Sequence, residues 1–137
     1  MNHIFYSAGY KYQLRGDYDI LTEICPQYDI GARFIILRTD GLLTIMDGYT
    51  WDGPSGLALD TANFMRASLV HDALYQLIRD NLIGYEYRQY ADRLLVRICR
   101  EDGMSKIRAW WVYQAVRFGG AASANTRNQK PIIRAPI

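Results

Sequence analysis

The spacing of hydrophobic residues along the chain changes once, near Gly56. Between Tyr10 and Thr50, short apolar runs alternate with turn residues, a pattern typical of strands. The Asp40-Gly41 pair separates the runs RFIILR and LLTIM and tolerates the positive φ of a tight turn, so it predicts a hairpin. We expect a small antiparallel sheet, with strands near residues 10–15, 18–24, 33–38 and 42–47.

After Gly56, apolar residues recur at helical spacing. Asp60-Thr61 is an N-cap candidate for the first helix, and Gly119-Gly120 is expected to end the third. The helices are predicted at about residues 61–81, 85–101 and 105–118. Short breaks make consecutive helices antiparallel neighbours. The fold class is therefore α+β, a small antiparallel β-sheet followed by three antiparallel α-helices.

The length of 137 residues, half of them hydrophobic, suits one domain and is too short for two ordinary ones. We expect a single α+β domain over residues 1–120. Residues 121–137 are small, polar and interrupted by proline, which predicts an irregular C-terminal tail.

Charge and cysteine content narrow the classes of partner and compartment. The net charge of +2 gives no general reason to expect a nucleic acid partner. Cys25 and Cys99 lie far apart in sequence, so we expect two small buried hydrophobic residues and a reducing compartment, not a disulfide or metal pair. No apolar run approaches the length of a transmembrane segment, and the N-terminus lacks the pattern of a signal peptide, so residence in a cytoplasm is expected.

The candidate chemistry lies on the first two predicted helices. His71 and Asp72 point about 100° apart on one helix, and Tyr75 is within reach of both faces. Asp92, on the antiparallel partner helix, is placed to hydrogen-bond one ring nitrogen of His71 and leave the other as a base. This is the arrangement of a carboxylate-oriented histidine. The alternative is a histidine satisfied inside the core, which is the more frequent case for HD-x-x-Y alone.

The loop WDGPSG, residues 51–56, joins the last predicted strand to the first helix. Its glycines and proline suit a loop that turns several carbonyl oxygens inward. Carbonyl oxygens together with a carboxylate such as that of Asp72 form a hard-oxygen set, which suits calcium better than zinc. The alternative is a strand-to-helix turn that binds nothing.

The segments GYTWDGPSG, RASLVHDALY, YADRLL and VYQAVRFGG together resemble a family of small tailed-bacteriophage proteins known mainly as a domain of unknown function. The resemblance covers about residues 30–122. It implies a phage product located in the host cytoplasm or associated with the virion. It implies little about chemistry.

The glycine-rich loop, HD-x-x-Y and the Ala-Asp of the next helix are also similar to the calcium-dependent secretory type of phospholipase A, particularly its disulfide-poor viral and bacterial forms. This similarity implies that His71 activates a water, Asp92 orients His71, and Tyr75 supports the network.

The same similarity implies that Asp72 binds calcium together with the backbone of Gly53 and Gly56. The chain departs from that family in two respects. Its loop has fewer glycines than is usual, and Pro54 removes one backbone donor that could stabilise an oxyanion.

Two hypotheses of function remain open. The first is a phage-encoded accessory protein with a phospholipase-like site, a calcium-dependent lipid ester hydrolase with phospholipid as substrate. The second is a non-enzymatic virion component or a protein that binds another phage or host protein, in which the His/Asp/Tyr cluster is a structural polar core. They differ in whether an open pocket reaches His71. The oligomeric state stays open.

Aromatic and basic residues gather on the later helices. One interpretation of Trp110, Trp111 and Tyr113 is an exposed aromatic patch for a membrane surface or a partner. Adjacent residues on a helix point to different faces, so at least one of Trp110 and Trp111 is instead expected in the core. The basic residues are expected on a solvated face, or on a face toward anionic lipid if they surround the aromatic residues. They are Arg93, Arg97, Arg100, Lys106 and Arg108.

Overall fold

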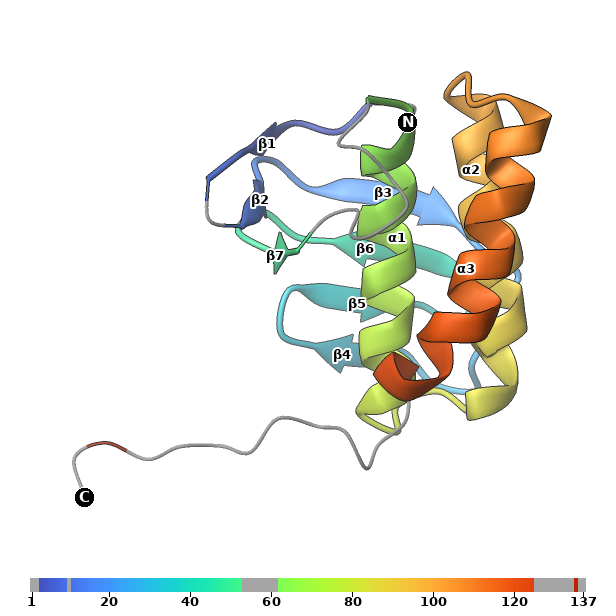
Figure 1. Cartoon of the computed structure of the whole chain (residues 1–137). Coiled ribbons are helices and arrows are strands. Elements are labelled where there is room, and N and C mark those ends of the chain that lie inside the picture. The colour runs from blue at the N-terminus through green and yellow to red at the C-terminus, as the bar shows by residue number, and fades with distance from the viewer. Residues whose placement is uncertain (1–2, 10, 53–61, 125–134, 136–137) are drawn as a thin grey trace.

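The computed structural model of the chain describes residues 3–9, 11–52, 62–124 and 135, with the side chains of residues 120–124 left out. Within these ranges, short strands form two antiparallel sheets and are followed by helices (Figure 1). The predicted α+β class is therefore confirmed. The candidate N-cap at Asp60-Thr61 lies outside the described residues.

The strands occupy the first part of the chain, as their turn-rich pattern predicted. They are β1 (Tyr6–Ser7), β2 (Tyr12–Leu14), β3 (Tyr18–Leu21), β4 (Ile30–Ala32), β5 (Ile35–Leu37), β6 (Leu42–Ile45) and β7 (Thr50–Trp51). One sheet has the order β1-β2-β7 and the other the order β3-β6-β5-β4. The sequence predicted one small sheet and did not indicate this division.

The hairpin predicted at Asp40-Gly41 joins β5 to β6. Leu37 lies opposite Leu43 across it. Gly41 has a φ of +91°, and its amide donates to the carbonyl of Arg38 at 2.9 Å. A Cβ at this position would collide with the carbonyl oxygen of Thr22, so the turn requires glycine for two reasons.

The strand predicted at 33–38 begins two residues later, because an unpredicted turn occupies its start. Arg33 and Phe34 form the link between β4 and β5, because Ala32 pairs directly with Ile35. Phe34 has a φ of +66°, which is unusual for an aromatic residue. Its carbonyl accepts a hydrogen bond from the amide of Met46 at 2.8 Å, so the β5–β6 ladder holds a turn that has no glycine, asparagine or proline to predict it.

The chain passes from the larger sheet to the smaller one between β6 and β7. The carbonyl of Leu14 accepts from the amide of Gly48, and the amide of Leu14 donates to the carbonyl of Tyr49, both at 2.8 Å. Trp51 in β7 is buried, and its Nε1 donates to Oγ of Ser68 at 3.0 Å. The small sheet is thereby bonded to the first helix.

The predicted helices are present as α1 (Ala62–Arg79), α2 (Arg88–Glu101) and α3 (Lys106–Ala124), with a 3₁₀ turn η1 (Tyr85–Tyr87) before α2. The predicted end of the third helix at Gly119-Gly120 is wrong, because α3 continues to Ala124. Each glycine costs a helix about 1 kcal/mol relative to alanine, and the sequence AASA that follows is favourable for helix.

α1 is the central element of the fold. It lies across the face of the four-stranded sheet, and α2 and α3 lie beside it (Figure 1). Thirteen of its eighteen residues are buried, including the polar residues Arg66, His71 and Tyr75. Buried polar groups need partners inside the protein, so each of these side chains is expected to organise a network.

Cys99 is buried as predicted, whereas Cys25 is exposed. Cys25 lies on the chain between β3 and β4. Among the described residues, no helix is long and apolar enough to cross a membrane. Residues 121–124 of the predicted irregular tail belong to α3, and the boundary between a domain at 1–120 and a tail at 121–137 otherwise stays a prediction.

Candidate active site

Asp92 on α2 is the centre of a polar cluster that joins all three helices. Its side chain is fully buried. Oδ1 accepts hydrogen bonds from Nε2 of His71 at 2.7 Å and from the hydroxyl of Tyr75 at 2.6 Å. Oδ2 accepts from Nη1 of Arg117 at 2.8 Å. The structure therefore brings together His71, Tyr75 and Asp92, the three residues for which the sequence predicted a shared site.

Helical geometry explains why His71 and Tyr75 reach one oxygen. They lie four residues apart on α1, so their side chains are on the same face. Their ring centroids are 4.1 Å apart with an interplanar angle of 37°. The antiparallel packing of α2 then presents Asp92 to both rings. Their roles in catalysis stay predictions.

Arg117 and Arg88 are members of the network that the sequence did not indicate. Arg117 on α3 pairs with Asp92, and its side chain is 29% exposed. Arg88, at the start of α2, is buried and donates through Nη2 to the main-chain oxygens of Val116 and Arg117 at 3.0 and 2.6 Å. Helical spacing could have indicated Arg117, because it follows Val116 at the edge of the inward face of α3.

Burial and charge act in opposite directions on His71. Burial lowers the pKa of its imidazole, but the carboxylates of Asp72 and Asp92 more than offset this, so the pKa lies above its ordinary value. Burial raises the pKa of Asp92, but the hydrogen bonds from His71 and Tyr75 outweigh it, so the pKa lies below its ordinary value. The pair thus favours a protonated imidazole beside an ionised carboxylate.

Tyr75 stays a neutral donor. Burial, and the nearby charge of Asp92, raise the pKa of its phenol well above the ordinary value. A phenol of raised pKa keeps its proton at neutral pH, so the hydroxyl of Tyr75 donates a hydrogen bond to Oδ1 of Asp92.

The two ring nitrogens of His71 differ in their hydrogen bonding. Nδ1 lies 3.9 Å from Oδ1 of Asp72, which is too long for a hydrogen bond. Within the described part of the chain, Nδ1 forms no hydrogen bond. The His71 side chain is 10% exposed and that of Asp72 is 37% exposed, so the unbonded edge of the imidazole lies toward a partly exposed carboxylate.

The predicted metal ligands are described only in part. Asp72 is placed, as above, but Gly53 and Gly56 lie outside the described residues. Among the residues that are described, no group of three or more His, Cys, Asp or Glu side chains could hold a metal ion. The calcium site therefore stays a prediction.

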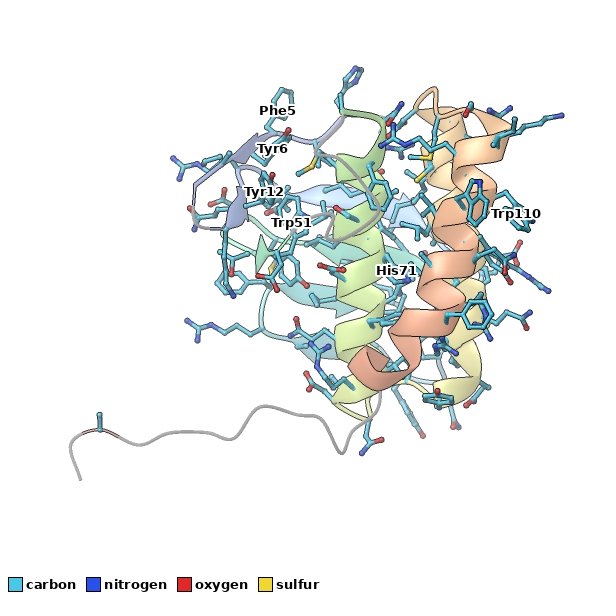
Figure 2. All side chains as sticks on the ribbon, viewed as in Figure 1. Phe5, Tyr6, Tyr12, Trp51, His71 and Trp110 are labelled. Carbon is cyan, nitrogen blue, oxygen red and sulfur yellow. The ribbon has the colours of Figure 1, made fainter. Side chains whose placement is uncertain are left out.

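A cavity of about 400 Å³ lies elsewhere, between α2 and α3. Neither His71 nor Tyr75 nor Asp92 lines it. Its position favours a separate role over access to the imidazole. Figure 2 shows Trp110, which lines this cavity, at α3, while Tyr6, Tyr12 and Trp51 gather at the opposite end of the molecule beside β1, β2 and β7.

Comparison with known protein families decides the membership of this chain. The sequence model of one family matches residues 42–116, which is more than half of the chain. The chain belongs to the DUF1353 family of proteins of unknown function. No curated protein and no solved structure matches the chain.

The DUF1353 match contains the whole predicted constellation of His71, Asp72, Tyr75 and Asp92, whereas Arg117 follows its last residue. Membership of an unknown-function family is therefore confirmed. The phage origin and the phospholipase similarity stay predictions.

Proposed function

We propose that this DUF1353 protein is a lipid ester hydrolase in which His71 is the general base and Asp92 orients it. One observation supports this most directly. Nε2 of His71 is bonded to buried Asp92 at 2.7 Å, whereas Nδ1 forms no hydrogen bond with any described residue. When the imidazole is neutral, donation from Nε2 leaves the lone pair on Nδ1, the atom that can accept a proton.

In the proposed reaction, a water molecule attacks the carbonyl carbon of the ester while its proton passes to Nδ1 of His71. The tetrahedral intermediate then collapses, the bond to the alcohol oxygen breaks, and Nδ1 returns the proton to that oxygen. The products are a carboxylic acid and an alcohol. Asp92 stabilises the imidazolium between the two steps, and Tyr75 and Arg117 hold Asp92 in place.

Calcium is part of the proposal. Asp72 is a partly exposed carboxylate beside Nδ1, and such a hard-oxygen donor fits this ion. Asp72 would hold it with the backbone at Gly53 and Gly56. When bound, calcium supplies positive charge that polarises the ester carbonyl. We further propose that the protein serves as an accessory protein of a bacteriophage.

The first test compares wild-type protein with His71→Gln on mixed phospholipid micelles. Hydrolysis by the variant should fall by about 10²- to 10⁴-fold, which is the usual contribution of a general base. His3→Gln is the matched control, since His3 is the other of the two histidines in the chain and is exposed. Equal hydrolysis by wild type and His71→Gln would overturn the proposal.

Calcium is tested by thermal unfolding with calcium or with a chelator. A ligand that binds only the native state raises its stability, so calcium should raise the Tm of wild type. Asp72→Asn should abolish the rise, while Asp80→Asn, an exposed aspartate at the end of the same helix, should keep it. No difference between calcium and chelator would refute the metal.

A second candidate function is a non-enzymatic binding protein with a structural polar core. It is favoured by the complete burial of Asp92, whose two oxygens accept three hydrogen bonds from α1 and α3. Asp92→Asn breaks a buried charge pair, so it should cost about 3–5 kcal/mol of unfolding free energy under both candidates. Hydrolysis by the variant separates them. Only under the proposed function does the fraction that stays folded also lose hydrolysis.

A further inference from the structure

α3 carries an apolar stripe on its outward face. Ile107, Trp110, Trp111 and Phe118 are 75%, 54%, 58% and 87% exposed. Spacings of three, four and seven residues place side chains on one side of a helix. We call these four residues the α3 outer face.

The prediction that Trp110 or Trp111 would be buried is therefore wrong. The inward face of α3 is already occupied by the buried residues Ala109 and Val112, which pack into the core. The two indoles instead contact each other, with centroids 4.9 Å apart in an edge-to-face arrangement. Large apolar side chains that lie exposed and contiguous mark an interaction surface.

Cations border the α3 outer face. The cavity of about 400 Å³ between α2 and α3 has Trp110 in its lining, with Arg93, Arg100 and Lys106 as its charged residues. Among the described residues, no acidic side chain lines it. An apolar surface bordered by positive charge suits a partner that has an anionic surface over an apolar interior.

Positive charge is concentrated in the later part of the chain, which contains α2 and α3. From Arg88 to the C-terminus the sequence has ten of the sixteen basic residues and only three of the fourteen acidic ones. These three are engaged: Asp92 by His71 and Arg117, and Glu101 and Asp102 by Arg66. The small net charge of +2 conceals this asymmetry.

We propose that the α3 outer face, with Arg93, Arg100 and Lys106, docks on a membrane surface that contains anionic phospholipid. Indole and phenyl rings bury favourably in the headgroup region of a bilayer. Each cation near an anionic surface adds attraction, and salt weakens it. A nucleic acid would match the cations but not the four exposed apolar side chains. An acidic protein is an outcome of the test below.

Docking here would bring a lipid substrate to the helix that supplies Arg117 to the His71 site. As a route to substrate, the inference rests on the proposed function. Membrane binding itself is measured without turnover, so the two can fail separately.

The experiment is flotation of the full chain with vesicles of phosphatidylcholine alone or mixed with phosphatidylglycerol. Wild type should float with the mixed vesicles, only weakly with phosphatidylcholine, and less as salt screens the charges. Trp110→Ser with Trp111→Ser should weaken binding about tenfold or more. Tyr28→Ser is the matched control, since Tyr28 is an aromatic residue that is 73% exposed on the strand side of the chain.

Charge is tested by Arg93→Glu with Lys106→Glu, which should abolish the preference for anionic vesicles. Arg33→Glu is the control for charge reversal, because Arg33 is an exposed cation in the turn between β4 and β5. Circular dichroism verifies that each variant is folded. The inference is overturned if wild type does not float, if both lipid mixtures bind equally, or if the controls lose as much binding.

Two further outcomes identify what else could cover the face. A wild-type dimer that ignores vesicles, and that Trp110→Ser with Trp111→Ser makes monomeric, would assign the face to self-association and overturn the inference. Binding to an acidic protein but not to vesicles would also overturn it. His71→Gln should float like wild type. Floating without hydrolysis by wild type would refute the proposed function alone, and hydrolysis of a soluble short-chain ester without floating would refute the docking alone.

Discussion

Two polar clusters built on buried side chains of α1 join this helix to α2, and they differ in what they leave unbonded. In the first, Arg66 of α1 donates through Nε and Nη2 to both oxygens of Asp102 at 3.0 and 2.8 Å, and through Nη2 to Glu101 at 3.0 Å. Its Nη1 donates to the hydroxyl of Tyr18 at 2.7 Å. Each nitrogen of the guanidinium is therefore engaged.

The second cluster has the same kinds of group, a carboxylate, a tyrosine and an arginine, but its α1 member is His71. The imidazole uses Nε2 to bond Asp92 and keeps Nδ1 unbonded among the described residues. Arginine stays charged at any physiological pH, whereas histidine titrates near neutrality. The Arg66 cluster can only hold elements together, whereas the His71 cluster also retains an atom that can accept a proton.

The largest effect that sharpens this comparison is expected from Arg66→Met. The substitution removes a buried guanidinium with four hydrogen bonds and leaves Asp102, whose side chain is 18% exposed, without this partner. The free energy of unfolding should therefore fall by about 3–5 kcal/mol. Urea denaturation measures the loss. Hydrolysis per folded molecule should be unchanged, and a selective loss of hydrolysis would break the division of roles.

Arg97→Met is the matched control, because Arg97 also pairs with Glu101, at 3.7 Å, but its side chain is 51% exposed. Exposed pairs contribute at most about 1 kcal/mol. A loss as large as that of Arg66→Met would show that burial is not what gives the Arg66 cluster its strength.

A smaller effect is expected from the two tyrosines. Tyr75→Phe and Tyr18→Phe each remove one hydroxyl bonded to a charged group, so each should lose about 1.5–3 kcal/mol of unfolding free energy. Only Tyr75→Phe should also reduce hydrolysis, since Tyr75 positions Asp92. The ratio of hydrolysis to folded fraction, measured for both variants, shows whether Tyr75 has a role that Tyr18 lacks. Equal ratios would contradict a functional difference between the clusters.

The smallest effect is a pH dependence confined to the second cluster. His71 has a raised pKa, so the stability it contributes is complete below its unfolded value near 6.5 and is lost as the pH rises through the folded pKa. Asp92 has a lowered pKa, so its contribution is complete above about 3.9 and is lost as the pH falls through the folded pKa. The cluster should therefore stabilise most between about pH 4 and 6.5.

Urea denaturation across this range measures it, with a slope for one proton of at most about 1.4 kcal/mol per pH unit. His71→Gln should remove the loss on the alkaline side, and Arg66→Met should keep it. Hydrolysis should show the opposite sign, rising as His71 loses its proton. A maximum of hydrolysis where the imidazole is protonated would contradict its role as base.

The sequence indicated His71, Tyr75 and Asp92 together because helical spacing and an antiparallel neighbour constrain which residues can meet. It did not indicate Arg117 or Arg88. Their contacts depend on where α3 lies against α2, and a basic residue on a late helix is ordinarily on a solvated face. Arg66 was missed for the same reason, since its partners come from β3 and from the end of α2.

Local patterns thus determined the α+β class, the β5–β6 hairpin, the three helices and the facing of His71 and Asp92, because each depends on neighbours within a few turns of chain. Tertiary structure decided the division into two sheets, the turn at Arg33-Phe34, the burial of α1 and the exposure of Trp110 and Trp111. These depend on which surfaces are already covered by distant elements. Burial is a property of the packed whole, and so the same residue type, arginine, lies in the core at position 66 and on the surface at position 93.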